Sequence, residues 1–270
     1  MPVHSMANHA VLLLQLVVVF IFIELLHTSS WTDRPLFPSQ QIPDDGLSPQ
    51  RSVVRRKIVL YHNFFRTKVS PKASDMLLMS WHPESARLAQ KYAEKCVFLE
   101  HSDPKENVVP HLGTCGQNLF VAEQKVPWFF ALKSWFSEYQ NFTYGRPSHD
   151  FKAIGHYTQM VWATSHKVGC GIAYCSGGKW GHFYNYVCHY CPGGNIGDHY
   201  YYPYKAGTPC ADCPDHCISG SLCSNTCGHL NMYSNCDSLV QQTNRDVCQQ
   251  GVCNASCLCG DKIYKNYPWY

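Results

Sequence analysis

Cysteine is the residue type that offers this chain the most chemistry. The 270 residues include 16 cysteines, an even number, and the first 95 positions contain none. In a reducing compartment so many thiols would need metal ions, whereas in an exported chain they pair as disulfides. The composition therefore predicts eight disulfides in the middle and C-terminal parts of the chain. With every cysteine paired, catalysis by a free thiol is not expected.

Hydrolytic chemistry has weaker support. A serine nucleophile needs an imidazole within hydrogen-bond reach and donors for an oxyanion. Ser102 directly follows His101, and an arrangement of Ser102 with His156 and Glu138 is the enzymatic alternative. The sequence contains neither a Gly-x-Ser-x-Gly elbow nor the helix motif of zinc proteases. We therefore expect that the chain is not an enzyme.

The N-terminus indicates export. Residues 11–26 are mostly apolar and are followed by small polar residues, which is typical of a signal peptide spanning residues 1–30 with cleavage near Ser30. A retained membrane anchor is the alternative, but the longest uninterrupted apolar run, residues 16–23, is too short to span a bilayer. We expect a secreted, extracellular protein without a membrane span after signal removal. The sequons at Asn141 and Asn254 fit this route as glycosylation sites.

The charge gives no reason to expect a nucleic-acid partner. The formal net charge is +3, and removing residues 1–30, which contain a single acidic residue, Glu24, raises it to +4. The densest basic cluster, residues 55–57, falls within a predicted helix, where it fits a solvated face better than a nucleic-acid patch.

Helical elements dominate the first half of the chain. Residues 31–47 are rich in Pro, Asp and Ser without periodicity, which predicts a flexible lead-in. Ser48 as N-cap and Pro49 at the first helical position predict a helix that ends before Pro71. A second helix is predicted from Pro83 to about Cys96. A third opens at Pro127, with its buried face at the positions Trp128, Leu132, Trp135 and Tyr139.

The second half of the chain predicts two strands, followed by a segment rich in cysteine. Residues 168–174 alternate with a period of two, a Gly-Gly turn comes next, and an aromatic run covers residues 183–187, which together predict a β-hairpin. Helices first and strands later favour helices packed on a small antiparallel sheet. From residue 205 onward the composition shifts, and ten of the 16 cysteines lie between 210 and 259. Such a segment has few apolar residues for a core and is expected to depend on disulfides.

Several short motifs resemble a known family. Residues 155–165 (GHYTQMVWATS) are similar to the first signature of the CAP superfamily, and residues 186–196 (YVCHYCPGGNI) are similar to the second. Residues 62–63, 115–119 and 135–138 fall at other landmarks of that superfamily. The cysteine pattern from residue 209 to 259 resembles the branch called cysteine-rich secretory proteins.

The resemblance implies a fold and a domain organisation. The fold class is α+β, a CAP-type α-β-α sandwich followed by a small, mostly helical, toxin-like domain. The expected parts are the signal peptide 1–30, the lead-in 31–47, a CAP domain 48–203, a hinge 204–225 and a cysteine-rich domain 226–270. The implied pairs are Cys96–Cys175, Cys115–Cys191, Cys170–Cys188, Cys210–Cys217, Cys213–Cys223, Cys227–Cys259, Cys236–Cys253 and Cys248–Cys257.

The resemblance also implies a polar cleft. CAP domains line such a cleft with two histidines and two acids, which map to His101, Gln117, Glu138 and His156. Two imidazoles and a carboxylate can bind zinc. Because Gln117 replaces one acid, and a neutral amide is a poorer zinc ligand, we expect at most weak zinc binding through His101, Glu138 and His156, and no other cofactor.

The expected function is binding. The resemblance implies a secreted protein that modulates a membrane protein, such as an ion channel, through its cysteine-rich domain, with Tyr233, Lys262 and Tyr264 as candidate contacts. The alternative is reproductive adhesion to a gamete-surface protein through the CAP domain, carried by residues 186–196. A further alternative is the binding of a sterol or another lipid.

Overall fold

The computed structural model describes residues 42–147, 150–177, 180–229, 231–233, 235–242, 246–260 and 262–263. The predicted signal peptide, most of the predicted lead-in and the candidate contact Tyr264 lie outside the described residues. The main helices and strands are α2 (Ser52–Arg66), β1 (Ser80–Trp81), α3 (Pro83–Ala93), β4 (Gly116–Ala122), α4 (Trp128–Ser137), α5 (Gly155–Met160), β5 (Lys167–Ser176) and β6 (His182–Cys191). Shorter elements are β2 (Val108–Val109), β3 (Gly113–Thr114), β7 (Cys217–Ile218), β8 (Leu222–Cys223), α6 (Cys236–Gln242), α7 (Asp246–Gln249) and α8 (Asn254–Leu258).

A four-stranded sheet forms the centre, in the order β1-β5-β6-β4. The predicted hairpin is confirmed, because β5 and β6 pair antiparallel from Lys167 opposite Cys191 to Ser176 opposite His182. The sequence did not indicate β4, which pairs antiparallel with β6. The sheet is also not purely antiparallel, since the two-residue edge strand β1 runs parallel to β5.

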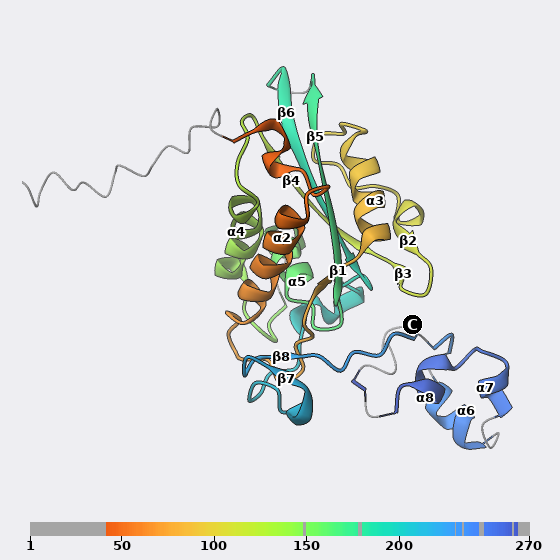
Figure 1. Ribbon diagram of the computed structural model, residues 1–270. Coiled ribbons are helices and arrows are strands. Elements are labelled where there is room, and N and C mark those ends of the chain that lie inside the picture. Colours follow the sequence, from red (N-terminus) through yellow and green to blue (C-terminus); the bar gives the residue numbers. More distant parts are fainter. Residues whose placement is uncertain are drawn as a thin grey trace, which may run out of the picture. The chain divides into compact units, whose positions relative to one another are not determined.

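Helices cover both faces of this sheet, so the α+β class is confirmed. In Figure 1, α3 lies on one side of β5 and β6, while α2, α4 and α5 lie on the other. The side of α2 that faces the sheet carries Val54, Ile58 and Phe65, which are all buried. The same core contains Trp128 and Trp135 of α4.

Three predicted helix details are wrong. The first helix begins at Ser52 rather than near Ser48, because residues 48–51 form a turn in which the Arg51 N–H donates to the Ser48 carbonyl. The second ends at Ala93, three residues before Cys96, whose φ of 56° is left-handed and incompatible with a right-handed helix. Tyr139 lies beyond the end of α4 and is half exposed rather than buried.

The end of the predicted flexible lead-in is folded. Asp44–Leu47 forms a 3-10 helix, and Leu47 is buried in the main core. The Leu47 carbonyl accepts a hydrogen bond of 2.7 Å from the indole N–H of Trp128. The composition of residues 31–47 could not predict this contact, because the partner, Trp128, lies 81 positions away in the sequence.

The glycines of β5 allow α3 to pack directly on the sheet. A Cβ added at Gly169 would lie 2.1 Å from the Ala86 backbone nitrogen, and one at Gly171 would lie 2.3 Å from the Gln90 Cα. The small residues in the alternating stretch 168–174 therefore have a packing cause. A side chain at position 169 or 171 would collide with the backbone of α3 and push the helix off the sheet.

We expect Gly169→Ala to lower the free energy of unfolding by about 2 kcal/mol or more, because the backbone of α3 cannot yield without moving the helix. Equilibrium denaturation by guanidinium under non-reducing conditions measures the change. Gly228→Ala is the matched control, since no atom lies within 4 Å of a Cβ added at Gly228. Equal stability of the two variants would contradict this packing argument.

Disulfides reinforce small apolar clusters in the C-terminal part. In the structure the 16 cysteines form eight disulfides in the pairs that the resemblance implies, and no cysteine is free. The three pairs after residue 225 join cysteines within the predicted cysteine-rich domain (residues 226–270, here called the terminal domain) to one another. Each such bridge contributes about 2–4 kcal/mol, mostly by restricting the unfolded chain.

The expected hinge, residues 204–225, is bonded to the larger domain. The Ser74 N–H donates to the Lys205 carbonyl at 2.9 Å, and the Leu78 N–H donates to the Cys223 carbonyl at 2.9 Å. In return the Cys223 N–H donates to the Met76 carbonyl at 2.8 Å. The segment therefore continues the hydrogen-bonded framework of the larger domain.

Candidate functional site

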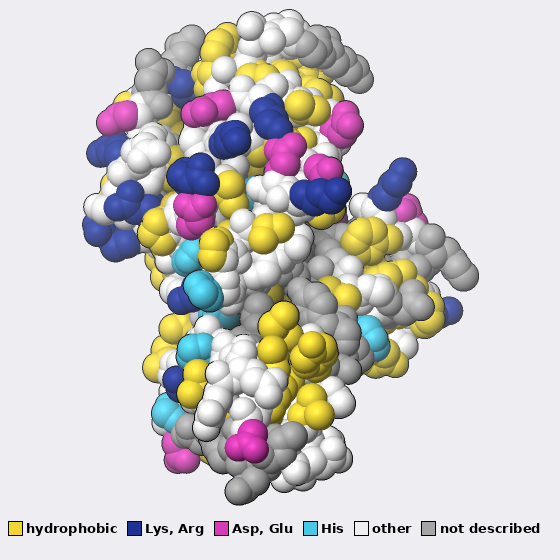
Figure 2. Space-filling model, turned by 90° about the vertical axis from the view of Figure 1, so that its right-hand side faces the viewer, with side chains coloured by type: hydrophobic (Ala, Val, Ile, Leu, Met, Phe, Trp, Pro, Cys, Tyr) yellow, Lys and Arg dark blue, Asp and Glu magenta, His cyan; other side chains and the backbone are white. Residues whose placement is uncertain are grey.

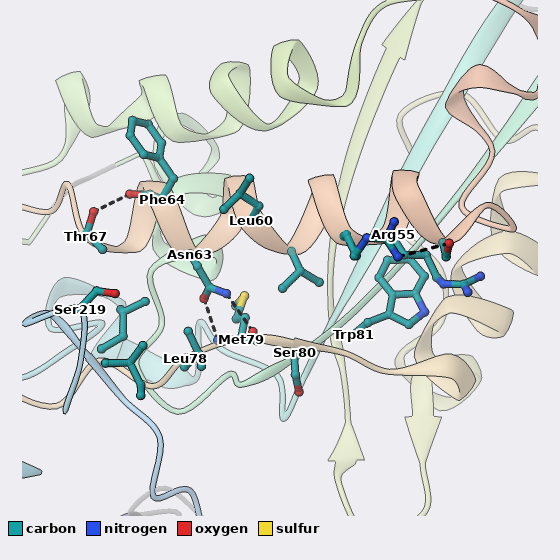
Figure 3. Close-up of a pocket in the computed structure, with 15 residues that line it drawn as sticks. Arg55, Leu60, Asn63, Phe64, Thr67, Leu78, Met79, Ser80, Trp81 and Ser219 are labelled. Carbon is teal, nitrogen blue, oxygen red and sulfur yellow. Dashed lines mark hydrogen bonds between the residues drawn. The ribbon is translucent and has the colours of Figure 1, made fainter. Parts of the chain in front are cut away.

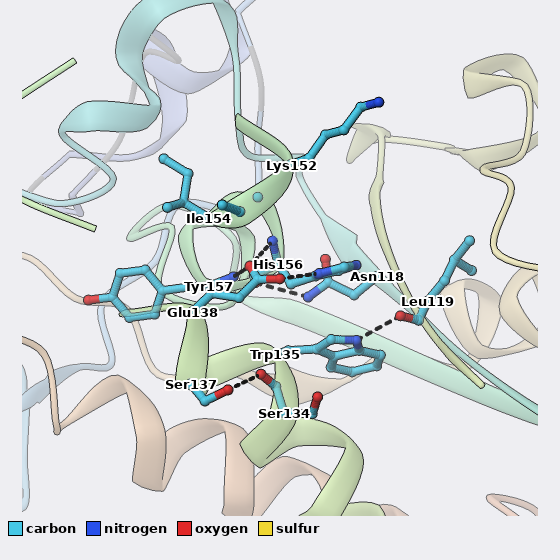
Figure 4. A network of polar contacts seen from close by, with 12 residues as sticks. Asn118, Leu119, Ser134, Trp135, Ser137, Glu138, Lys152, Ile154, His156 and Tyr157 are labelled. Atoms are coloured by element: carbon cyan, nitrogen blue, oxygen red, sulfur yellow. Dashed lines mark hydrogen bonds and ion pairs between the residues drawn. The ribbon is translucent and has the colours of Figure 1, made fainter. Parts of the chain in front are cut away.

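A carboxylate and a histidine form the centre of the predicted cleft. Glu138 begins a 3-10 turn directly after α4, and His156 lies in the first turn of α5. The His156 Nδ1 lies 2.6 Å from the Glu138 Oε1, while the backbone N–H groups of His156 and Tyr157 donate to the Glu138 Oε2 at 2.9 and 3.1 Å (Figure 4). Three donors therefore hold this carboxylate, which in turn fixes the orientation of the imidazole.

The second histidine is held by an amide instead of an acid. The Gln117 Oε1 lies 2.8 Å from the His101 Nδ1 and accepts from the Ser102 N–H at 3.2 Å. The Gln117 Nε2 donates to the Ser102 Oγ at 3.1 Å and lies 3.1 Å from the His189 Nε2. Because both amide hydrogens are donated, His189 accepts through Nε2, and His101 donates through Nδ1.

The partner of this amide, His189, was missed by sequence reasoning. It is completely buried on β6, and burial lowers its pKa to about 4. A neutral ring is the form that can accept the hydrogen bond from Gln117. An ionised glutamate at position 117 would have no hydrogen to donate. The hydrogen bond to a neutral His189 therefore requires the amide of Gln117. The sequence shows His189 only as a histidine within the second signature, and its spacing does not link it to Gln117 or to the other predicted cleft residues.

The four predicted residues do not form a compact three-ligand metal centre. His101 and His156 are each held through Nδ1, and neither Nε2 has a hydrogen-bond partner among the described residues. Within the described ranges, the single group of three potential ligands whose atoms lie within 4.8 Å of one another is Cys210, Cys213 and Cys223, all of which are in disulfides. The Glu138 oxygens are already occupied by N–H donors, which leaves the Nε2 of each histidine as its candidate ligand atom.

Restoring the acid should strengthen zinc binding. We expect Gln117→Glu to raise the zinc affinity about tenfold or more, because a carboxylate behind His101 makes its imidazole a better ligand. Isothermal titration with zinc chloride measures the affinity. Gln249→Glu adds the same charge at an exposed position of α7 and should leave the affinity unchanged. Equal affinities for Gln117→Glu and the unaltered chain would contradict this role of the amide.

The serine-based alternative finds no support in the geometry. The Ser102 hydroxyl donates to the Asn107 Oδ1 at 2.9 Å and accepts from the Asn107 Nδ2 at 2.7 Å. With the additional bond from Gln117, the hydroxyl is bonded to two amides and to no imidazole among the described residues. Of the alternative Ser102–His156–Glu138 arrangement, the structure forms the His156–Glu138 pair, while Ser102 is bonded elsewhere.

The region that was predicted to carry adhesion is mostly interior. Residues 186–191 of the second signature belong to β6, and every one of these side chains is buried. Tyr190 is an example, since its hydroxyl lies 2.9 Å from the Nε2 of the buried His62. A partner protein cannot contact these buried side chains directly, so the adhesion hypothesis is left with the half-buried residues 193–196 of the signature.

The surface of the terminal domain carries apolar side chains. Tyr233, a predicted contact, is 52% exposed, and Met232 and Leu258 are 68% and 59% exposed. The sequence reading missed Met232 and Leu258, because nothing in their spacing distinguishes them from core residues. Lys262 is exposed, and it precedes Ile263, whose N–H donates to the Asn225 carbonyl at 3.2 Å.

Hydrogen bonds tie the exposed loop that carries Met232 and Tyr233 to other parts of the terminal domain. The Met232 N–H donates to the Val252 carbonyl at 2.7 Å, and Asn231 bonds both the backbone N–H and the hydroxyl of Ser256. The Ser256 hydroxyl in turn donates to Asp237 at 2.6 Å. The apolar side chains at 232 and 233 thus project from a cross-linked frame that has little conformational entropy to lose on binding.

The two sequons differ in their surroundings. Asn141 is exposed, whereas Asn254 is half-buried at the start of α8. The hydroxyl of the second sequon, Ser256, is already bonded to Asn231 and Asp237. Asn141 is therefore the more accessible of the two predicted glycosylation sites.

Charged side chains of both signs are mixed on the surface of the larger domain (Figure 2). On the face shown in Figure 2, basic and acidic side chains are interspersed rather than separated. Arg56 and Lys57 of the predicted basic cluster are exposed on α2, and Arg55 is half-buried. Among the helices of the described residues, none is both long and apolar enough to cross a membrane.

Comparison with known proteins identifies similar chains. The model of the cysteine-rich secretory protein family (CAP) matches residues 59–190, and the Crisp model matches residues 210–264. Human cysteine-rich secretory protein 3 is 43% identical over 235 residues, which cover 85% of this chain and 94% of that protein. Human cysteine-rich secretory protein 2 is 42% identical over 241 residues, which cover 85% of this chain and 95% of that protein.

Solved structures show the same fold in the larger domain. A crystal structure of NaASP2 with Zn2+ matches with a TM-score of 0.54 and 30% identity, covering 67% of this chain and 99% of that one. The structure of BmVAL-1 matches with a TM-score of 0.51 and 27% identity, covering 68% of this chain and 98% of that one.

Proposed function

This chain belongs to the cysteine-rich secretory protein family, and from that premise we propose that it is a secreted binding protein without catalytic activity. It acts by modulating a membrane protein, an ion channel being the expected class, through the terminal domain. The disulfide content and the relatives named as secretory proteins support an extracellular location.

The observation that carries the proposal is the rigid apolar loop of the terminal domain. Met232 and Tyr233 are more than half exposed, yet backbone and side-chain hydrogen bonds fix the segment that bears them. Aromatic and methionine side chains on a preorganised frame are favoured in the centres of protein interfaces. Three internal disulfides hold this frame together.

The larger domain supplies the support for this contact surface. The hydroxyl of Ser102, the candidate nucleophile, bonds Asn107 and Gln117, which supports a binding protein over a serine hydrolase. The cleft histidines remain available for weak zinc binding, in which His101 and His156 would offer nitrogens and water would fill the other positions. In this proposal, zinc would orient the two imidazoles and would have no catalytic role.

Electrical recordings test the proposal. The full chain is applied to oocytes that express a panel of voltage-gated potassium and calcium channels, and the concentration for half-maximal effect is measured. Tyr233→Ala should weaken the effect about tenfold or more, because an exposed aromatic anchor is lost. Tyr139→Ala is the control, since Tyr139 is 50% exposed on the larger domain against 52% for Tyr233. An equal effect of both substitutions, or no effect of the full chain on any channel, would refute the proposal.

A further inference from the structure

A groove of about 810 Å³ lies outside the polar cleft, between α2, residues 78–81 and the β7–β8 hairpin. Figure 3 shows its walls: Leu60 and Phe64 project from α2, and Leu78, Met79 and Trp81 lie on the segment opposite. Ile218 and Leu222 of the hairpin also line the groove.

The helix α2 has a second apolar face toward this groove. Its first apolar face, with Val54, Ile58 and Phe65, is buried against the sheet. Leu60 and Phe64 lie elsewhere on the helix and are 63% and 46% exposed. With Ile218, which is 42% exposed, they form an open apolar surface on two elements that are 151 or more positions apart in sequence. Exposed apolar surfaces of this kind mark interaction sites.

The groove is preorganised. The Asn63 side chain spans from α2 to the opposite wall, where it donates to the Met79 carbonyl at 2.9 Å and accepts from the Met79 N–H at 2.8 Å (Figure 3). The hairpin wall is fixed by the bonds of Cys223 to Met76 and Leu78, and by two disulfides within residues 210–223. A ligand therefore meets walls that are already in place.

The charges at the groove have one sign. Arg55 and Arg56 are among its lining residues, and none of the described residues that line it is Asp or Glu. The Arg55 Nη1 donates to the carbonyls of Pro49 and Gln50 at 3.1 and 2.8 Å, which places its guanidinium at the N-terminal end of α2. The Arg56 Nη1 lies 3.4 Å from the Ser52 Oγ. A complementary ligand is apolar along its length and acidic at one end.

We propose that this groove docks an acidic amphipathic polypeptide segment of a partner protein. The segment lays its apolar side chains against Leu60, Phe64 and Ile218 and directs a carboxylate toward Arg55 and Arg56. A helix in a groove, with anchors spaced three or four residues apart, fits a trough that runs beside α2. A lipid is a weaker fit, because sites for small ligands enclose most of the ligand surface, whereas this groove is open. The site is separate from the terminal-domain loop and does not depend on the channel proposal.

Selection from a peptide library tests the proposal with the full chain. Random 16-residue peptides displayed on phage are selected on the immobilised chain, and enriched peptides are synthesised with a fluorophore. Their affinities are measured by fluorescence anisotropy. The expected peptides combine apolar residues three or four positions apart with Asp or Glu near one end. Their affinity should fall about tenfold or more for Leu60→Asp and for Arg56→Glu, because an apolar anchor and a charge partner are removed.

Two residues of the same helix supply the controls. Val53 is 38% exposed and Lys57 is exposed, and neither lines the groove. Val53→Asp and Lys57→Glu make the same changes of type and charge and should leave the affinity unchanged. Since Leu60 and Arg56 are exposed, their variants should fold, and thermal unfolding checks this. No enrichment, binding insensitive to the groove variants, equal losses for the controls, or displacement of the peptides by oleate would overturn the proposal.

Discussion

Replacing Arg66 by Met should lower the free energy of unfolding by about 3–5 kcal/mol, because it removes a buried charged group from a network of carbonyls. Arg66 is 1% exposed at the end of α2. Its guanidinium donates to the carbonyls of Leu77, Met160, Trp162 and Ala163 at distances of 2.8–3.0 Å. The side chain thereby joins α2, the segment before β1 and the segment after α5.

Two comparison variants define the cause. Arg66→Lys keeps the charge but cannot reproduce the forked donor geometry, so it should recover part of the loss. Arg56→Met removes an exposed arginine from the same helix and should change the stability by less than about 0.5 kcal/mol. Guanidinium denaturation under non-reducing conditions measures all three. A loss for Arg66→Met no larger than that for Arg56→Met would contradict the structural role of this network.

Acid should destabilise the fold well above the pH at which carboxylates titrate. Burial lowers the pKa of His62, His166 and His189 from 6.5 to about 4 in the folded chain. The unfolded chain therefore binds more protons between these values, and the stability that the neutral rings provide is complete above pH 6.5 and is lost as the pH falls toward 4. Each histidine can remove up to about 3 kcal/mol over this range.

The contacts of these histidines support the neutral form. The His62 Nδ1 lies 2.8 Å from the Ile58 carbonyl, and its Nε2 lies 2.9 Å from the Tyr190 hydroxyl. The His166 Nε2 and the His189 Nδ1 are buried and have no hydrogen-bond partner among the described residues. Protonation would place a buried charge beside groups that cannot stabilise it.

Denaturation midpoints at pH 7 and pH 4.5 measure this effect. We expect a large decrease for the unaltered chain and a smaller decrease for His166→Leu, which removes one of the three titrating groups. The exposed His182→Gln should behave like the unaltered chain, because solvent reaches this ring in the folded protein. A pH dependence unchanged by His166→Leu would show that other groups cause the acid sensitivity.

The larger elements of the fold could be predicted because their signals are local. The alternation of residues 168–174 predicted β5, and the aromatic positions after Pro127 predicted α4. The strand β4 was missed, since its seven residues lack a clear alternation and pair with β6 about 70 positions away. Helix ends were misplaced where a turn or a left-handed residue, such as Cys96, stopped the helix.

The site was less predictable, because its arrangement depends on long-range contacts. The family landmarks located His101, Gln117, Glu138 and His156, but not the bond from Gln117 to His189. His62 and Asn63 were noted as landmarks without a role, and in the structure they hold Tyr190 and Met79. The docking groove had no signal in the sequence, because its walls come from residues 52–81 and 218–222.

The most direct test of the binding function compares the full chain with a chain that ends at Asn225. This truncation removes the terminal domain and its three disulfides but leaves the other five pairs intact. Both proteins are applied to the channel that responds to the full chain, with circular dichroism as the check on folding. We predict that the full chain modulates the current and that the truncated chain does not. Equal modulation by the folded truncated chain would contradict the assignment of function to the terminal domain.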